Sequence, residues 1–429
     1  MSTKRRITQG IGANGFGQVV TILIQIASVP ILIHAWGIIR YGEWITLSAI
    51  PAYLVLSDIG FTSVAGNSLA LMAEKNDVRE MQSIYQSTLV MVSILSAVVL
   101  AVIAGTVWFT NLGEMIGLTS ITNSTLNLTL LVLFLHVAMS MQTGILQLPF
   151  RALKRNPMSV TAANLIRLLE WVAATLVVIK GGTVVEFAVA FLVVRILGNF
   201  GLWLAINRSG SSLKFGIQYA NLRTIKTLLR PSLASLCFPL GLSFTIQGFI
   251  LLISSIYGPA AVALFSIYRT FTRVPIQLAT AINQAVWPEL SYAFGTNNLS
   301  KAKKLVIKMQ QFGAVLSMMS AIAIYFQGET TINFWVSKSL EHNSPLLIAL
   351  TLTALIHILW QPYWVAQMAI NKHTHFALSF LTISALSLAL GWIFMIEFNL
   401  QGAGYAILVS EFLMAGSAFY TFTKYFKAT

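Results

Sequence analysis

Long apolar stretches separated by short polar turns recur along the whole chain. Each is about 20 residues or longer, which is enough to cross a ~30 Å hydrocarbon core as a helix. The stretches lack the apolar and polar alternation of barrel strands, and only helices or closed barrels satisfy the backbone in lipid. We therefore predict an all-α membrane protein of about twelve transmembrane helices. The predicted spans are 13–35, 44–72, 81–109, 125–149, 157–180, 184–206, 231–256, 259–290, 305–327, 345–370, 376–396 and 401–423.

Composition and charge placement agree with this pattern. The chain of 429 residues is 56% hydrophobic and 9% charged, whereas a soluble domain is usually about 25% charged. A net charge of +14 would otherwise suggest a nucleic-acid partner. With the N-terminus inside, however, 20 of the 27 Lys and Arg residues lie in cytoplasmic segments, and only Arg40, Lys180 and Lys338 lie outside. This positive-inside bias predicts that both termini are cytoplasmic and that no nucleic acid is bound.

The chain also contains a weak internal repeat. A shift of 221 residues aligns Gly37 with Gly258, and the turn at 75–79 with the turn at 296–300. We predict a six-helix lobe at 1–206 and a second at 231–429, joined by a basic cytoplasmic segment at 207–230. Because each lobe has an even number of spans, the repeat should be parallel, with a pseudo-two-fold axis along the membrane normal.

Four arginines lie near the middle of predicted spans: Arg167, Arg195, Arg269 and Arg273. An arginine at the bilayer centre costs about 2.5–3.5 kcal/mol on insertion scales, so these side chains should face a wet chamber inside the helix bundle. Guanidinium forms bidentate, charge-assisted bonds to phosphate and stays protonated. We predict that the four arginines bind an anionic head group, for which phosphate fits best.

Carboxylates at similar depth leave several alternatives open. Asp58, Glu170 and Glu411 can be counter-ions or proton or sodium coupling sites. Arg167 and Glu170 are three residues apart and can pair, and Arg195 can pair with Asp58 or Glu411. Arg269 and Arg273 have no acidic neighbour within a turn, which favours anion contact.

Polar residues at helical spacing form stripes that indicate the same chamber. Asn14, Gln18 and Gln25 follow one face of the first predicted helix, and Gln277 continues the face of Arg269 and Arg273. A polar stripe on an otherwise apolar helix belongs beside water. The histidines follow no metal-ligand spacing, and we expect no metal, no cofactor and no catalytic residue.

Several short motifs carry a family resemblance. They are Asn-Gly at 14–15 with Gln18 and Pro30, Gly37 with Tyr-Gly-Glu-Trp at 41–44, Asp-Ile-Gly at 58–60, Arg-Ala-Leu-Lys-Arg at 151–155, and Pro-Glu-Leu-Ser at 288–291. Over essentially its whole length the chain resembles the bacterial polysaccharide flippases (O-antigen, Wzx type). These proteins belong to the multidrug/oligosaccharidyl-lipid/polysaccharide exporter superfamily.

The resemblance implies a non-enzymatic flippase in the bacterial inner membrane. It would export an undecaprenyl-pyrophosphate-linked oligosaccharide by alternating access, for lipopolysaccharide O-antigen or another surface polysaccharide. The expected partners are this lipid-linked substrate, membrane lipids and polysaccharide polymerase machinery.

Two other functions fit the sequence less well. A cation-coupled multidrug antiporter of the same superfamily is disfavoured because the first helix lacks a carboxylate and four arginines suit cationic drugs poorly. A membrane polysaccharide polymerase or ligase usually needs a sizeable outer loop, and the longest predicted one, 328–344, is short.

Overall fold

The computed structural model describes residues 3–427, with gaps at 76, 110–112, 114–115, 119, 154, 297, 337–341 and 371. All the regular structure in these residues is helical. Ten of the described helices are long and apolar enough to cross a membrane. The prediction of a helical, multi-pass membrane protein is thus confirmed, whereas the count of twelve spans and the orientation of the termini stay predictions.

The chain forms two compact units. The first contains Met1–Ile24 and Ala35–Ser243, and the second contains Gln25–His34 and Phe244–Thr429. The elements of the first are most of α1 (Thr3–Glu74), α2 (Val78–Phe109), α4 (Asn123–Ala152), α5 (Asn156–Ile179), α6 (Val184–Arg208), α7 (Leu222–Ser235) and α8 (Cys237–Ser243). The second contains the π-helical turn η1 (Phe244–Gly248), α9 (Phe249–Thr272), α10 (Val274–Gly295), α11 (Leu299–Val336), α12 (Ser344–Ala369), α13 (Thr374–Phe398) and α14 (Gln401–Lys427).

Two glycines break the long helices α1 and α9. Gly37 has φ 78° and ψ 171°, and Gly258 has φ 78° and ψ −175°. This backbone region is essentially restricted to glycine. The two positions aligned by the shift of 221 residues therefore share one conformation, and each lies between two predicted spans.

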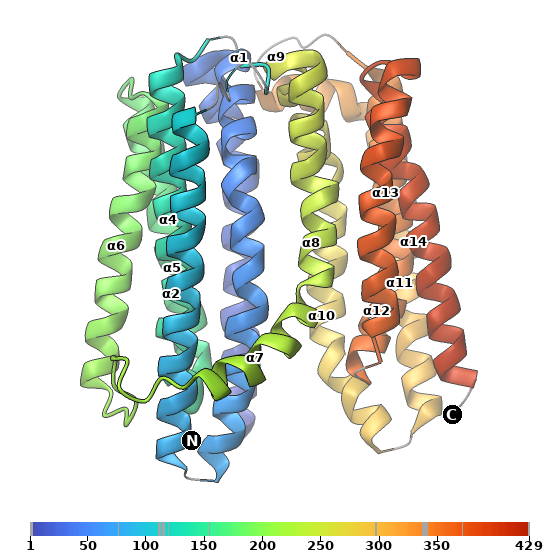
Figure 1. Ribbon diagram of the computed structural model, residues 1–429. Helices are drawn as coiled ribbons and strands as arrows, with labels where there is room; N and C mark the ends of the chain where they lie inside the picture. The colour runs from blue at the N-terminus through green and yellow to red at the C-terminus, as the bar shows by residue number, and fades with distance from the viewer. Residues whose placement is uncertain are drawn as a thin grey trace. The chain divides into compact units, whose positions relative to one another are not determined.

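In the first unit α4 packs against α2, α5 and α6, which run alongside it (Figure 1). Leu126, Leu130 and Phe134 of α4 belong to a buried cluster with Leu47 of α1 and Val184 of α6. Apolar side chains gain little from leaving lipid for the protein interior, so close packing and interhelical hydrogen bonds hold such helices together.

The segment that follows α6 is fixed to α2. Gln82 accepts from the backbone N–H of Lys214 at 2.9 Å, and Gln86 accepts from that of Tyr219 at 2.6 Å. Ser83 and Thr224 share a hydrogen bond of 3.1 Å between α2 and α7. These bonds attach the basic segment at 207–230 to the first unit.

In the second unit α12 packs against α10, α11 and α14, and α14 packs also against α13. Ile276 and Ala279 of α10 meet Ala354 and Ile358 of α12 in one buried cluster. The Trp360 ring packs against Phe376 of α13, with ring centroids 5.4 Å apart. Trp360 is thereby buried between α12 and α13.

Candidate functional site

A buried ion pair joins α5 and α6 in the first unit. Arg195 donates from Nε to Oε1 of Glu170 and from Nη2 to Oε2, each at 2.6 Å. His136 Nε2 of α4 lies 3.0 Å from the same Oε1. Glu170 is 1% exposed and Arg195 8% exposed. Bidentate, charge-assisted bonds of this kind are among the strongest that side chains form.

Neutral groups complete the surroundings of Arg195. Its Nη1 donates to Thr143 at 3.4 Å, Thr143 donates to Asn199 Oδ1 at 2.7 Å, and Asn199 donates to the Met139 carbonyl at 2.7 Å. Gly198 lies where a Cβ atom would come within 2.7 Å of Ile166, so its missing side chain brings α5 and α6 close enough for the pair. The donors of Arg195 are engaged inside the unit.

The structure corrects two pairings expected from the sequence. Arg195 pairs with Glu170 rather than with Glu411, and the side chain of Asp58 lies outside the described residues. Glu170 does not take Arg167 as its ion-pair partner among the described residues. Arg167 donates instead from Nη2 to the Thr21 hydroxyl at 2.8 Å. Although three residues apart, Arg167 and Glu170 reach different neighbouring helices.

The second unit holds a carboxylate of a different kind. Glu411 of α14 accepts from the Trp360 indole N–H at 2.6 Å, and its other oxygen lies 3.1 Å from His357 Nδ1. Glu411 is 9% exposed. No arginine forms an ion pair with it among the described residues. Glu170 is thus neutralised by a fixed cation, whereas Glu411 is bound by an indole and an imidazole.

The sequence pattern does not identify His136, His357 and Trp360 as partners of the deep carboxylates. A signal was available, because 357 − 136 = 221, the same shift that aligns Gly37 with Gly258. Each histidine contacts the deep carboxylate of its own unit.

The remaining deep arginines lie on α9 and at its end. Arg269 donates from Nη1 to the Ile246 carbonyl of η1 at 3.0 Å, and its Cζ lies 5.4 Å from the Phe265 ring centroid. Arg273 stands at the junction of α9 and α10. Among the described residues its guanidinium has no hydrogen-bond or ion-pair partner, although Glu411 is near enough to act on it electrostatically. Arg273 is therefore the deep arginine whose donors remain available.

The predicted polar stripes are only partly brought together. Gln277, one turn beyond Arg273, donates from Nε2 to Gln25 Oε1, so these two residues meet in the second unit. The Gln277 Oε1 atom is buried and has no partner in the described part of the chain. Asn14 is exposed and Gln18 is partly buried.

The deep charges differ between the two units when every deep carboxylate is ionised. Arg167 and Arg195 with Glu170 and Asp58 give 2 − 2 = 0, and Arg269 and Arg273 with Glu411 give 2 − 1 = +1. The described residues contain no group of three His, Cys, Asp or Glu side chains placed to hold a metal ion.

Comparison with solved structures shows which known proteins share the fold of this chain. No family model matches the chain, and neither does any curated protein. A multidrug resistance MATE family transporter of the MOP superfamily, solved in an inward-facing conformation, matches with a TM-score of 0.72 and 14% identity, over 95% of this chain and 98% of the other. The lipid II flippase MurJ in an inward closed conformation matches with a TM-score of 0.68 and 15% identity, over 95% and 86%.

The chain has the fold of these transporters. A third similar structure, a MATE protein in complex with MaL6, matches with a TM-score of 0.63 and 15% identity, over 99% of this chain and 96% of the other. These neighbours are transporters and a flippase rather than enzymes. The same fold thus occurs in a multidrug transporter and in a lipid flippase. The fold therefore does not identify the substrate, which must be inferred from the side chains of the site.

Proposed function

We propose that the chain is a transporter of the MOP superfamily that exports a lipid-linked oligosaccharide by alternating access. Its substrate would be an undecaprenyl-pyrophosphate-linked repeat unit, and its place the bacterial inner membrane, where the product serves O-antigen or another surface polysaccharide. The observation that carries the proposal is the guanidinium of Arg273, which has no hydrogen-bond or ion-pair partner among the described residues.

The free-energy cost of placing Arg273 within the membrane supports a role in substrate binding. A guanidinium at the bilayer centre costs about 2.5–3.5 kcal/mol on insertion scales. Ser, Asn and Gln would hold helices together at a lower cost. A phosphate oxygen that accepts from Arg273 would supply the missing partner and add a charge-assisted bond.

The other three deep arginines each have a partner inside the protein, and only Arg269 is assigned a contact with the substrate. Arg195 is held by Glu170, and Arg167 donates to Thr21. Arg269 lies four residues before Arg273 and donates to a main-chain carbonyl, a contact that a phosphate oxygen can replace. We therefore assign the first phosphate contact to Arg273 and the second to Arg269.

The membrane potential favours export of such a head group. Each negative charge that leaves a negative interior gains about 2.3 kcal/mol per 100 mV, so two charges gain roughly 4–5 kcal/mol. Export can therefore run without a coupled ion, and Glu411 is the carboxylate available if proton or sodium entry is coupled.

A transport assay on the purified full chain tests the proposal. Proteoliposomes would carry a fluorescent polyprenyl-pyrophosphate-linked sugar, and a membrane-impermeant quencher would report its movement between leaflets. Loss of a charge-assisted bond of about 1.5–3 kcal/mol predicts that Arg273→Ala slows movement about tenfold or more. Arg273→Lys should retain part of the rate because it keeps the charge.

Arg79→Ala is the matched control, since it removes an exposed arginine at the start of α2. It should leave the rate unchanged. An Arg273→Ala protein that moves the pyrophosphate lipid as fast as the unmodified chain would contradict the proposal.

A second function is favoured by two observations. The fold likeness to a multidrug resistance MATE family transporter has the highest TM-score of the three described above, 0.72, and Glu411 is a buried carboxylate without an arginine partner among the described residues. Both suit a cation-coupled multidrug antiporter. The same proteoliposomes, given a proton or sodium gradient and an organic cation such as tetraphenylphosphonium, distinguish the two, because an antiporter would move the cation and not the pyrophosphate lipid.

A further inference from the structure

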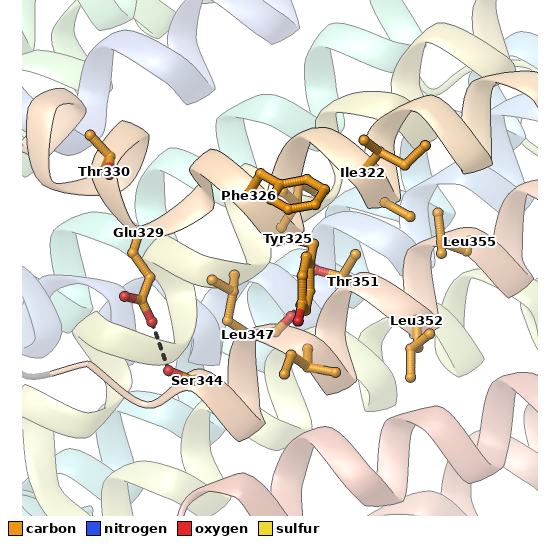
Figure 2. A pocket seen from close by; sticks show the side chains of 13 residues that line it. Ile322, Tyr325, Phe326, Glu329, Thr330, Ser344, Leu347, Thr351, Leu352 and Leu355 are labelled. Carbon is orange, nitrogen blue, oxygen red and sulfur yellow. Dashed lines mark hydrogen bonds between the residues drawn. The ribbon is translucent and has the colours of Figure 1, made fainter.

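A groove runs between α11 and α12 in the second unit (Figure 2). It encloses about 580 Å³ and is lined by residues within 321–330 and 344–355. Both helices are long and apolar enough to cross a membrane. The groove therefore lies on two spans, at one end of each.

The shape of the groove follows from where the two helices touch. A Cβ atom on Gly313 would lie 3.1 Å from Ile358 Cγ2, and one on Gly328 would lie 3.4 Å from Leu347 Cδ2. The helices thus approach closely at two levels. The apolar part of the groove lies between these levels along both helices.

Buried residues form the floor of the groove and exposed residues form its walls. Leu347 and Thr351 are buried, whereas Ile322 is 54% exposed and Leu352 43% exposed. Large apolar side chains exposed on a membrane span suit contact with hydrocarbon. The walls of the groove are therefore matched to the acyl chains of a lipid.

One end of the groove is polar. Glu329, Thr330 and Ser344 lie there, and the Ser344 hydroxyl donates to Glu329 Oε1 at 2.7 Å, as the dashed line in Figure 2 shows. Glu329 is the one charged side chain among the thirteen described residues that line the groove. A carboxylate offers about four acceptor sites, so one bond from Ser344 leaves room for another donor.

We infer that this groove binds a membrane phospholipid with a primary-amine head group, that is, phosphatidylethanolamine. One acyl chain would lie against Ile322, Leu352 and Leu355, and the ammonium would donate to Glu329. An ammonium carries three N–H donors and complements the carboxylate. An anionic head group such as phosphatidylglycerol is repelled, and a choline head group has no N–H to donate.

The dimensions of the groove agree with a lipid lying along the bilayer normal. Ile322 and Glu329 are seven residues apart on α11, which at 1.5 Å per residue is roughly 10 Å. That length is about a third of the ~30 Å hydrocarbon core. The carboxylate thus stands near the head-group level when the apolar residues contact the tail.

This site is distinct from the one assigned to the transported pyrophosphate. Arg273 stands between α9 and α10, whereas the groove belongs to α11 and α12. Lipid in the groove is therefore a bound component of the membrane, whichever substrate the protein carries.

Native mass spectrometry of the purified full chain tests the inference. The protein would be offered phosphatidylethanolamine, phosphatidylglycerol and phosphatidylcholine with identical acyl chains in equal amounts. Because exposed ion pairs are weak, we expect a preference of about three- to fivefold for phosphatidylethanolamine. Glu329→Gln should abolish that preference, and acetylation of the lipid amine should have the same effect.

Glu397→Gln is the control, since Glu397 is another exposed carboxylate near a helix end, on α13. It should keep the preference. An unchanged preference in Glu329→Gln, or equal retention of the three lipids by the unmodified chain, would overturn the inference. A mass of two lipid-free copies of the chain would assign the groove to self-association and overturn it as well.

Discussion

Replacement of Glu170 by alanine would leave the guanidinium of Arg195 buried without its counter-ion. Arg195 is 8% exposed and loses both of its 2.6 Å bonds to the carboxylate. Removal of one partner of a buried ion pair typically costs about 3–5 kcal/mol, because the remaining charge is uncompensated. We expect a loss of that size for Glu170→Ala.

A second substitution, Arg195→Met, removes the guanidinium that Glu170→Ala leaves without a counter-ion. Replacing a buried ion pair by apolar residues is often neutral or stabilising, so Glu170→Ala combined with Arg195→Met should recover most of the stability. His136, which also contacts the carboxylate, is present in every variant. The coupling between the two substitutions therefore reports the Glu170–Arg195 pair itself.

Thermal unfolding of the full chain in detergent, followed by tryptophan fluorescence, measures the effect. A loss of 1 kcal/mol lowers Tm by about 2–4 °C in a domain of comparable size, which places the Glu170→Ala transition about 10 °C below the unmodified protein. The exposed Glu397→Ala variant serves as the control. A Glu170→Ala protein that melts within about 2 °C of the unmodified chain would refute the reasoning, as would a double variant no more stable than Glu170→Ala.

Three further outcomes follow from single side chains. Gly37→Ala or Gly258→Ala should lower stability by about 1–3 kcal/mol in the same melting assay, because the glycine-only backbone at each site excludes alanine. Trp360→Phe should cost about 1–3 kcal/mol, because an oxygen of the buried Glu411 loses its donor. Burial lowers the pKa of His373 from its ordinary 6.5, so the unfolded chain takes up the proton first. Stability should then be full above pH 6.5 and should fall as the pH drops from 6.5 towards the lower folded value, and His373→Gln should remove this component of the pH profile.

Hydropathy predicted the helices because the bilayer imposes both their length and their composition. The apolar stretch at 125–149, for example, falls within α4, and the stretch at 157–180 matches α5 to within one residue at each end. The breaks at Gly37 and Gly258 were also readable, since a glycine between two apolar stretches marks a backbone that other residues avoid. The π-helical turn η1, whose Ile246 carbonyl accepts from Arg269, has no comparable signature in the sequence.

The choice of charge partners was not readable from the sequence. Arg167, three residues from Glu170, was an expected partner, yet the carboxylate takes Arg195 on the next helix. Which faces of α5 and α6 meet depends on packing, including the close approach at Gly198. Depth in the membrane identified the arginines, but only the packed structure separates Arg195, whose donors are engaged, from Arg273, whose donors are not.

Equilibrium binding to the purified chain tests the central claim most directly. The two ligands would be a polyprenyl pyrophosphate and the organic cation tetraphenylphosphonium, each titrated into the unmodified protein and into Arg273→Ala. We predict that the unmodified protein prefers the pyrophosphate and that Arg273→Ala weakens its binding about tenfold or more, the loss of a charge-assisted bond. A protein that prefers the cation, and binds it more tightly once Arg273 is removed, would contradict the account.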